Sequence, residues 1–216
     1  SRTQSNTNAW KKSKWSAQNP SMKTILLFGA PGSGKGTQGR VLGQMPNYFY
    51  FACGDVFRNL RPENPLGKKF MEFSSKGELV PDELTVELWH KHLTVSTSEG
   101  DFHPDHDWLV LDGIPRNPHQ VDMMSETIDV RAVLHLACND MSKMEERIQR
   151  RALKENRMDD GNVEVIRHRF ETYMRETQPV LDCYPNKIVH ELDSTKSPAN
   201  VLRDVLNVIV ELESAN

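Results

Sequence analysis

Residues 29–37 read Gly29-Ala30-Pro31-Gly32-Ser33-Gly34-Lys35-Gly36-Thr37 and decide the fold. The stretch fits G-x-x-x-x-G-K, a pattern that binds phosphate when a strand precedes it and a helix follows. Here an apolar run over 23–28 precedes it, and we expect a helix over 35–44. Glycines let backbone N–H groups turn toward phosphate oxygens, and the helix N-terminus adds partial positive charge. The sequence therefore predicts a P-loop for a nucleoside triphosphate or a similar polyphosphate.

The rest of the chain alternates short apolar runs with amphipathic stretches, which is typical of an α/β protein. Strands are expected over Lys23–Phe28, Tyr48–Cys53, Trp108–Leu111, Val130–Leu136 and Lys187–Leu192. Helices are expected over Lys35–Gln44, Pro65–Ser75, Pro81–Ser98, Asp140–Glu155, Val163–Cys183 and Pro198–Glu213. Strands separated by helices predict a five-stranded parallel sheet with helices on both faces, the P-loop NTPase fold.

Length, charge and cysteine content exclude several classes of protein. The 216 residues suit one domain with small insertions. Lys and Arg total 27 and Asp and Glu 30, and this net charge of −3 argues against a nucleic-acid or membrane partner. No apolar run approaches the roughly 18 residues of a membrane span. Three widely spaced cysteines (Cys53, Cys138 and Cys183) argue against a disulfide scaffold or a four-Cys zinc site and favour a reducing, cytoplasmic setting.

Residues 1–21 differ from the remainder of the chain. They carry Arg2, Lys11, Lys12 and Lys14 but no acidic residue, and the first acid is Asp55. Polar, low-complexity termini seldom join a core, so we expect a disordered extension or a tag. A transit segment is the alternative, because such peptides are basic, rich in Ser and poor in acids, and it would imply an organellar location.

Further motifs occur in the order found in nucleoside monophosphate kinases. Residues 29–38 resemble the family pattern G-x-P-G-x-G-K-G-T-Q, with its Thr one place later than in the general P-loop, and 53–58 resemble T-G-D-x-x-R. Residues 77–82 and 112–120 resemble G-x-L-V-x-D and D-G-F-P-R-x-x-x-Q. Residues 157–160 and 169–179 resemble R-x-D-D and R-x-x-x-Y-x-x-x-T-x-P. The resemblance covers about 23–213 and is greatest to the short-lid adenylate kinases.

This resemblance implies a single kinase domain over 22–216 with two small insertions. A helical monophosphate-binding insert would occupy 52–80, and a short lid would occupy 150–161. Long lids in some family members carry four metal-binding residues, often Cys. Because this lid has no Cys, no structural zinc is expected. We expect a monomer that acts on small nucleotides.

The resemblance also implies reversible, Mg²⁺-dependent phosphoryl transfer from ATP to AMP, giving two ADP. Arginine suits this chemistry, because its charged, planar fork matches phosphate oxygens. The implied catalytic residues are Lys35, Arg116, Arg151, Arg157 and Arg169. Those implied for ATP are Gly32, Ser33, Gly34, Lys35, Gly36, Thr37, Arg151 and Lys196. Those implied for AMP are Cys53, Arg58, Glu78, Leu79, Val80, Gly113, Arg116, Gln120, Arg157 and Arg169. Thr37 and Asp112, through water, are implied for Mg²⁺.

Some choices stay open at this point. Gln120 favours AMP because an amide can pair with the edge of adenine, whereas family members acting on UMP and CMP carry Asn there. Cys53 stands where AMP enzymes usually have Thr, so a UMP/CMP kinase or a broader nucleoside monophosphate kinase is the alternative. The residues leave open whether ATP or GTP is the donor. One extra residue between Asp160 and Arg169 also allows Arg167 and Arg169 to exchange roles.

Overall fold

The computed structural model describes residues 21–155 and 162–215. The terminal segment 1–20 and residues 156–161 of the expected lid, Arg157 among them, lie outside the described residues. Within the described ranges, no helix is both long enough and apolar enough to cross a bilayer.

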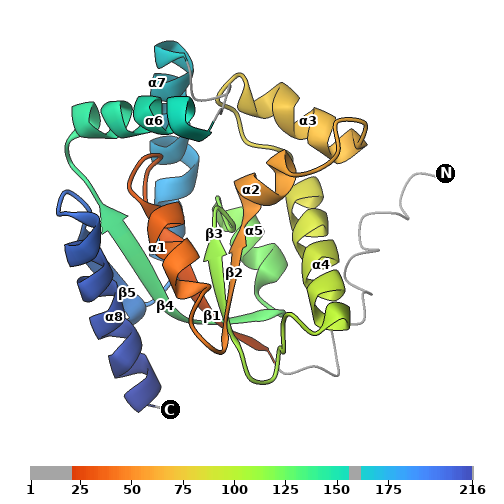
Figure 1. The fold of residues 1–216 in the computed structure, drawn as a ribbon, viewed down its shortest axis with the longest axis vertical. Helices are drawn as coiled ribbons and strands as arrows, with labels where there is room; N and C mark the ends of the chain where they lie inside the picture. Colours follow the sequence, from red (N-terminus) through yellow and green to blue (C-terminus); the bar gives the residue numbers. More distant parts are fainter. Residues whose placement is uncertain (1–20, 156–161, 216) are drawn as a thin grey trace.

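Five parallel strands form one sheet, as the sequence predicts (Figure 1). The strands are β1 (Met22–Phe28), β2 (Tyr48–Ala52), β3 (Trp108–Asp112), β4 (Ile128–Ala137) and β5 (Val189–Asp193), and their order in the sheet is β2-β3-β1-β4-β5. After β1 the chain crosses toward the β2 edge of the sheet, and after β3 it crosses in the opposite direction, to β4. The carboxyl ends of the neighbouring strands β1 and β3 therefore form a topological switch point, where open α/β sheets bind ligands.

Alternating side chains of β1 bury against two helical layers. Ile25 and Leu27 pack with α1 (Lys35–Leu42) and α8 (Pro198–Ser214). Leu26 and Phe28 pack in the cluster that holds α4 (Asp82–Glu99) and α5 (Pro118–Met124). This period of two, buried on both faces, explains why the strand is apolar throughout.

Four further helices lie above the carboxyl edge of the sheet in Figure 1. They are α2 (Cys53–Arg58) and α3 (Pro65–Ser74) on one side, and α6 (Met141–Glu155) and α7 (Val163–Thr172) on the other. These helices place polar side chains beyond the strand ends, where the P-loop also lies.

The structure corrects several boundaries. Helices α2 and α5 were not expected, and the second strand ends at Ala52 because Cys53 already begins α2. The helix expected over 163–183 ends at Thr172 and continues as a π-helical turn (Tyr173–Thr177) and a 3₁₀ helix (Gln178–Cys183). Pro179 lacks an N–H and its ring clashes with the preceding turn, so a regular α-helix cannot pass through it. A short 3₁₀ helix (Asn186–Ile188) replaces the expected start of the last strand.

Candidate functional site

A cavity of about 700 Å³ lies at the switch point. Its walls come from the P-loop, from α2 and the segment before α4, from the loop after β3, from α6 and α7, and from the loop after β5. Every residue predicted for ATP contributes to the wall: Gly32, Ser33, Gly34, Lys35, Gly36, Thr37, Arg151 and Lys196. Segments that are far apart in the chain therefore share one cleft.

The P-loop depends on glycines at positions that other residues rarely adopt. Gly29, Gly32 and Gly34 have φ angles of 149°, 81° and 97°. A Cβ on Gly29 would lie 2.6 Å from both the Leu136 carbonyl oxygen and Ser33 Oγ. Ser33 Oγ is buried without a hydrogen-bond partner among the described residues. A tightly wound loop with an unpartnered hydroxyl beside the start of α1 is suited to receive phosphate oxygens.

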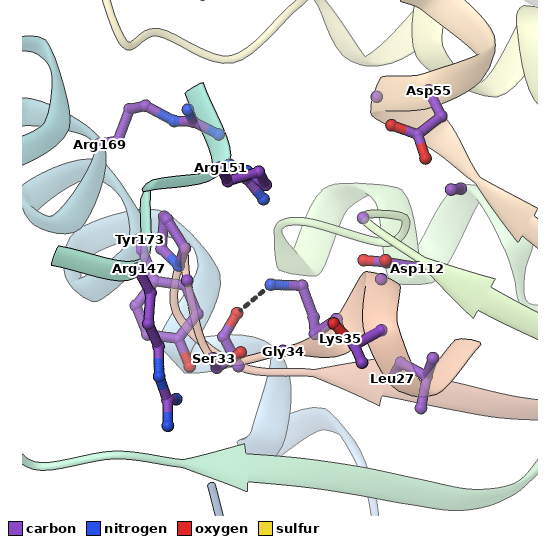
Figure 2. A pocket seen from close by; sticks show the side chains of 18 of the residues that line it. Leu27, Ser33, Gly34, Lys35, Asp55, Asp112, Arg147, Arg151, Arg169 and Tyr173 are labelled. Carbon is purple, nitrogen blue, oxygen red and sulfur yellow. Dashed lines mark hydrogen bonds between the residues drawn. The ribbon is translucent and has the colours of Figure 1, made fainter. Parts of the chain in front are cut away.

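Lys35 lies at the base of the cleft. Its Nζ donates hydrogen bonds to the carbonyl oxygens of Gly29 at 2.7 Å and Ala30 at 3.2 Å, and Figure 2 shows the side chain turned along the loop. Burial lowers the pKa of Lys35 to about 8, an effect that Asp112 opposes and the nearby arginines reinforce. A buried ammonium among other cations is stabilised by an incoming anion, so this position favours phosphate.

Four predicted arginines line the same cleft from different elements: Arg58, Arg116, Arg151 and Arg169. Arg116 Nε donates to the Gly113 carbonyl oxygen at 2.8 Å, which fixes the direction of its guanidinium group. Figure 2 shows Arg151 and Arg169 on the side of the cleft opposite Asp55. Guanidinium groups approaching from several directions can surround a polyanion and stabilise the charge on a transferring phosphoryl group.

The structure also places Arg147, Arg150 and Lys154 of α6 in the wall, which our site prediction omitted. Arg147 lies one helical turn before Arg151 on α6. The spacing of four residues that places Arg147 and Arg151 on one helix face was the signal available in the sequence. On α7, Arg169 lines the cleft, whereas Arg167 Nε lies 3.3 Å from Glu145 and does not.

Oxygen donors for a divalent cation are present beside Lys35. Asp112 at the end of β3 and Thr37 on α1 both line the cleft. The described residues contain no group of three or more His, Cys, Asp or Glu that could hold a metal by themselves. One carboxylate and one hydroxyl next to a phosphate site match Mg²⁺, which keeps several waters and uses substrate phosphates as ligands.

The predicted acceptor residues divide into two groups. Glu78, Leu79, Val80 and Gly113 line the cleft with Arg58, Arg116 and Arg169, but Cys53 and Gln120 do not. Cys53 is buried, and this burial raises the pKa of its thiol to about 11. Gln120 is buried as well: its Nε2 donates to Asp82 Oδ1 at 2.8 Å, and its Oε1 accepts from the Arg116 N–H at 2.7 Å. The two residues that were expected to select the base therefore lie behind the wall of the cleft.

The loop after β5 contributes mainly through its position. Lys196 Nζ lies 2.7 Å from Asp204 on α8, so its charge is already paired. Gln38 Nε2 on α1 donates to the carbonyl oxygen of Pro198 at 3.1 Å, which joins the start of α8, directly after this loop, to the P-loop helix.

Comparison with known proteins agrees with this geometry. The family model for adenylate kinase matches residues 27–189. An adenylate kinase of Prochlorococcus marinus (strain MIT 9211) is 35% identical over 201 residues, which cover 88% of this chain and 100% of the relative. Adenylate kinases of Flavobacterium psychrophilum (32% identity; 88% of this chain and 100% of the relative) and Micrococcus luteus (33%; 90% and 94%) match over similar lengths. The chain belongs to the adenylate kinase family.

Proposed function

We propose that this chain catalyses the reversible transfer of the terminal phosphoryl group of ATP to AMP, giving two ADP. The observation that carries the proposal is one continuous cleft with the P-loop and Lys35 on one part of its wall and Arg58 and Arg116 on another. Two phosphate-binding groups in one cleft suit a donor and an acceptor that both carry phosphate. The enzyme would act as a monomer on small nucleotides.

The acceptor needs no general base, because a monophosphate is already anionic near neutral pH. The difficulty is the approach of two polyanions, and positive charge on the protein overcomes it. Lys35 and the P-loop would hold the donor phosphates, while Arg58 and Arg116 would hold the acceptor phosphate. Arg151 and Arg169 would stabilise the charge on the group in transfer. Arg157, which lies outside the described residues, is proposed for the same role by resemblance alone.

Thr37 and Asp112 would hold Mg²⁺, Asp112 through water. When bound, the ion would neutralise charge on the phosphates and favour an in-line arrangement of the donor and acceptor oxygens. Asp112 also lowers the cost of placing Lys35 in a buried site, because its carboxylate raises the pKa of that lysine against the effect of burial.

We further propose that residues 52–80 form the monophosphate-binding insert and that residues 150–161 form the lid. Within the described residues, α2, the segment 77–80 and the last turns of α6 support this division, since all of them line the cleft. Water excluded by their closure could not take the phosphoryl group from ATP.

A coupled assay of ADP formation tests the proposed function. Mg-ATP is supplied with AMP, UMP, CMP or GMP in separate reactions, and GTP replaces ATP in a parallel series. We expect strong turnover with ATP and AMP, and none with Lys35→Met protein prepared in the same way. Turnover with UMP or CMP equal to or above that with AMP would make the pyrimidine kinase the correct assignment.

A further inference from the structure

Tyr50 lies in the centre of β2, and two glycines lie against it: Gly39 in α1 and Gly43, which follows the last residue of that helix. A Cβ on Gly39 would lie 2.1 Å from Tyr50 Cε2, and a Cβ on Gly43 would lie 2.7 Å from Tyr50 Cβ. These distances are far below van der Waals contact, so a side chain at Gly39 would overlap the ring and one at Gly43 would overlap the Tyr50 Cβ. The phenol is therefore held in a fitted slot between α1 and the sheet.

The hydroxyl of Tyr50 points from this slot toward the cleft. It donates a hydrogen bond to Asp112 Oδ2 at 2.9 Å across the β2–β3 pair. Tyr50 itself does not line the cleft, whereas Asp112 does. A phenol is protonated at neutral pH and can donate this bond.

The two oxygens of the Asp112 carboxylate have different surroundings. Tyr50 occupies Oδ2, and no described residue donates a hydrogen bond to Oδ1. A carboxylate held through one oxygen cannot rotate freely, so the other oxygen keeps one direction relative to the phosphate site. Such outer partners commonly tune the affinity of the metal-binding group they hold.

We propose that Tyr50 is a positioning residue for phosphoryl transfer, holding Asp112 in the orientation needed for the cation that accompanies the phosphates. This inference rests on the proposed function, because that function supplies the task of Asp112. Tyr50 touches neither nucleotide in this account and acts only through the carboxylate.

The chain offers a matched control on the same strand. Tyr48, two residues earlier, also donates its hydroxyl proton to a carboxylate, Glu213 Oε1, at 2.6 Å. That pair joins β2 to the end of α8, and neither residue lines the cleft. Tyr48→Phe and Tyr50→Phe therefore remove the same atom and the same type of bond, but only one of them affects Asp112.

The test compares both variants with the wild type in two measurements. One is the Mg²⁺ concentration that gives half-maximal ADP formation. The other is the Mn²⁺ affinity of the ATP-bound protein without AMP, followed by electron paramagnetic resonance, and it requires no turnover. For Tyr50→Phe we expect both to weaken by about tenfold, the lower end of the usual effect of losing an outer partner. Tyr48→Phe should match the wild type in both, and thermal unfolding would show that each variant is folded.

Wild-type metal affinity in Tyr50→Phe, or an equal loss in both variants, would overturn the inference. The two proposals can also fail separately. If the wild type formed no ADP from AMP, the proposed function would be wrong, and the Mn²⁺ measurement would still decide whether Tyr50 positions Asp112.

Discussion

The burial of Lys35 affects how the protein binds phosphate as the pH changes. Its ammonium group is buried beside Asp112 and three arginines, and its pKa is lowered to about 8. Below that pH the group is charged, and above it the free protein loses the charge that phosphate binds. Bound phosphates favour the charged form, so binding above pH 8 must take up a proton. We expect ATP affinity to be level between pH 7 and 8 and then to fall by up to about tenfold per pH unit.

Isothermal titration calorimetry between pH 7 and 9.5 would measure this dependence. Repeating it in buffers of different ionisation enthalpy would count the proton directly. Lys35→Met should bind ATP weakly at every pH and show no proton uptake. An affinity of the wild type that stays level to pH 9.5 would contradict the assigned environment of Lys35.

Gly39 matters because it has no side chain, which leaves space for the ring of Tyr50. Gly39→Ala would drive a methyl group into the ring of Tyr50, and overpacking of this kind costs about 1–3 kcal/mol of unfolding free energy. Gly36, three residues earlier in α1, is the control, because a Cβ there meets only the flexible end of Arg40 at 3.6 Å. Gly36→Ala should be neutral or stabilising, since alanine favours a helix. Urea unfolding would separate the two, and equal stabilities would refute the close approach.

At the scale of the element, α7 presents two arginines in different directions. Arg169 lines the cleft, and Arg167 faces α6 with its guanidinium group near Glu145. We expect Arg169→Ala to lower kcat on the order of a hundredfold, as the loss of a group that stabilises developing charge does. Arg167→Ala should stay within about twofold of the wild type, because exposed ion pairs contribute little. Steady-state kinetics would test the pair, and the reverse pattern would assign the catalytic role to Arg167.

The junction of α4 and α5 supports the acceptor site from behind. Asp82 accepts hydrogen bonds from Asn117 and Gln120 at 2.8 Å and lies 3.0 Å from the His119 ring. Burial opposes ionisation of Asp82, but these hydrogen bonds outweigh it and lower its pKa. Gln120 in turn accepts from the backbone of Arg116, so Asp82 supports the loop that carries this arginine.

We therefore expect Asp82→Ala to weaken the acceptor side of the cleft. The buried amide of Gln120 and the half-buried amide of Asn117 would lose their acceptor, which costs about 1–3 kcal/mol of stability. KM for AMP should rise several-fold, while KM for ATP should change little. Glu83→Ala, an exposed neighbour on the same turn of α4, is the control. Equal changes in both Michaelis constants would mean that the network supports the whole cleft and not the acceptor side.

The sequence predicted most of the long elements, apart from the end of the helix expected over 163–183, and missed the short helices for a physical reason. The run 23–28 and the loop after it carry their own signals, apolar residues and glycines, within a few positions. Helices α2 and α5 have six and seven residues, which is too short to show a helical period. Likewise, the burial of Gln120 depends on Asp82, which lies 38 residues away in the chain. The strand order also arises from contacts between distant segments.

At the scale of the whole molecule, the order of the strands explains why one ligand can reach both the P-loop and the Arg116 loop. The P-loop follows β1 and the Arg116 loop follows β3, and these strands are hydrogen-bonded neighbours. Their loops therefore emerge side by side at the same edge, and α6 and α7 complete the wall. A polyphosphate-bridged bisadenosine should occupy both sites at once, bind one per chain, and bind more tightly than ATP or AMP alone, as ligands that join two substrates do.

Thermal unfolding would measure how much more the dinucleotide stabilises the chain than ATP or AMP does. At a thousandfold excess over its Kd, the dinucleotide should stabilise the chain by about 4 kcal/mol, which corresponds to a rise in Tm of roughly 8–16 °C for a protein of this size. Arg116→Ala should leave the smaller ATP shift intact and remove most of the additional shift, because only the acceptor end loses its partner. Lys35→Met should reduce both shifts. A dinucleotide shift that equals the ATP shift and is unaffected by Arg116→Ala would mean that the cleft holds a single nucleotide, which is incompatible with direct transfer between two bound substrates.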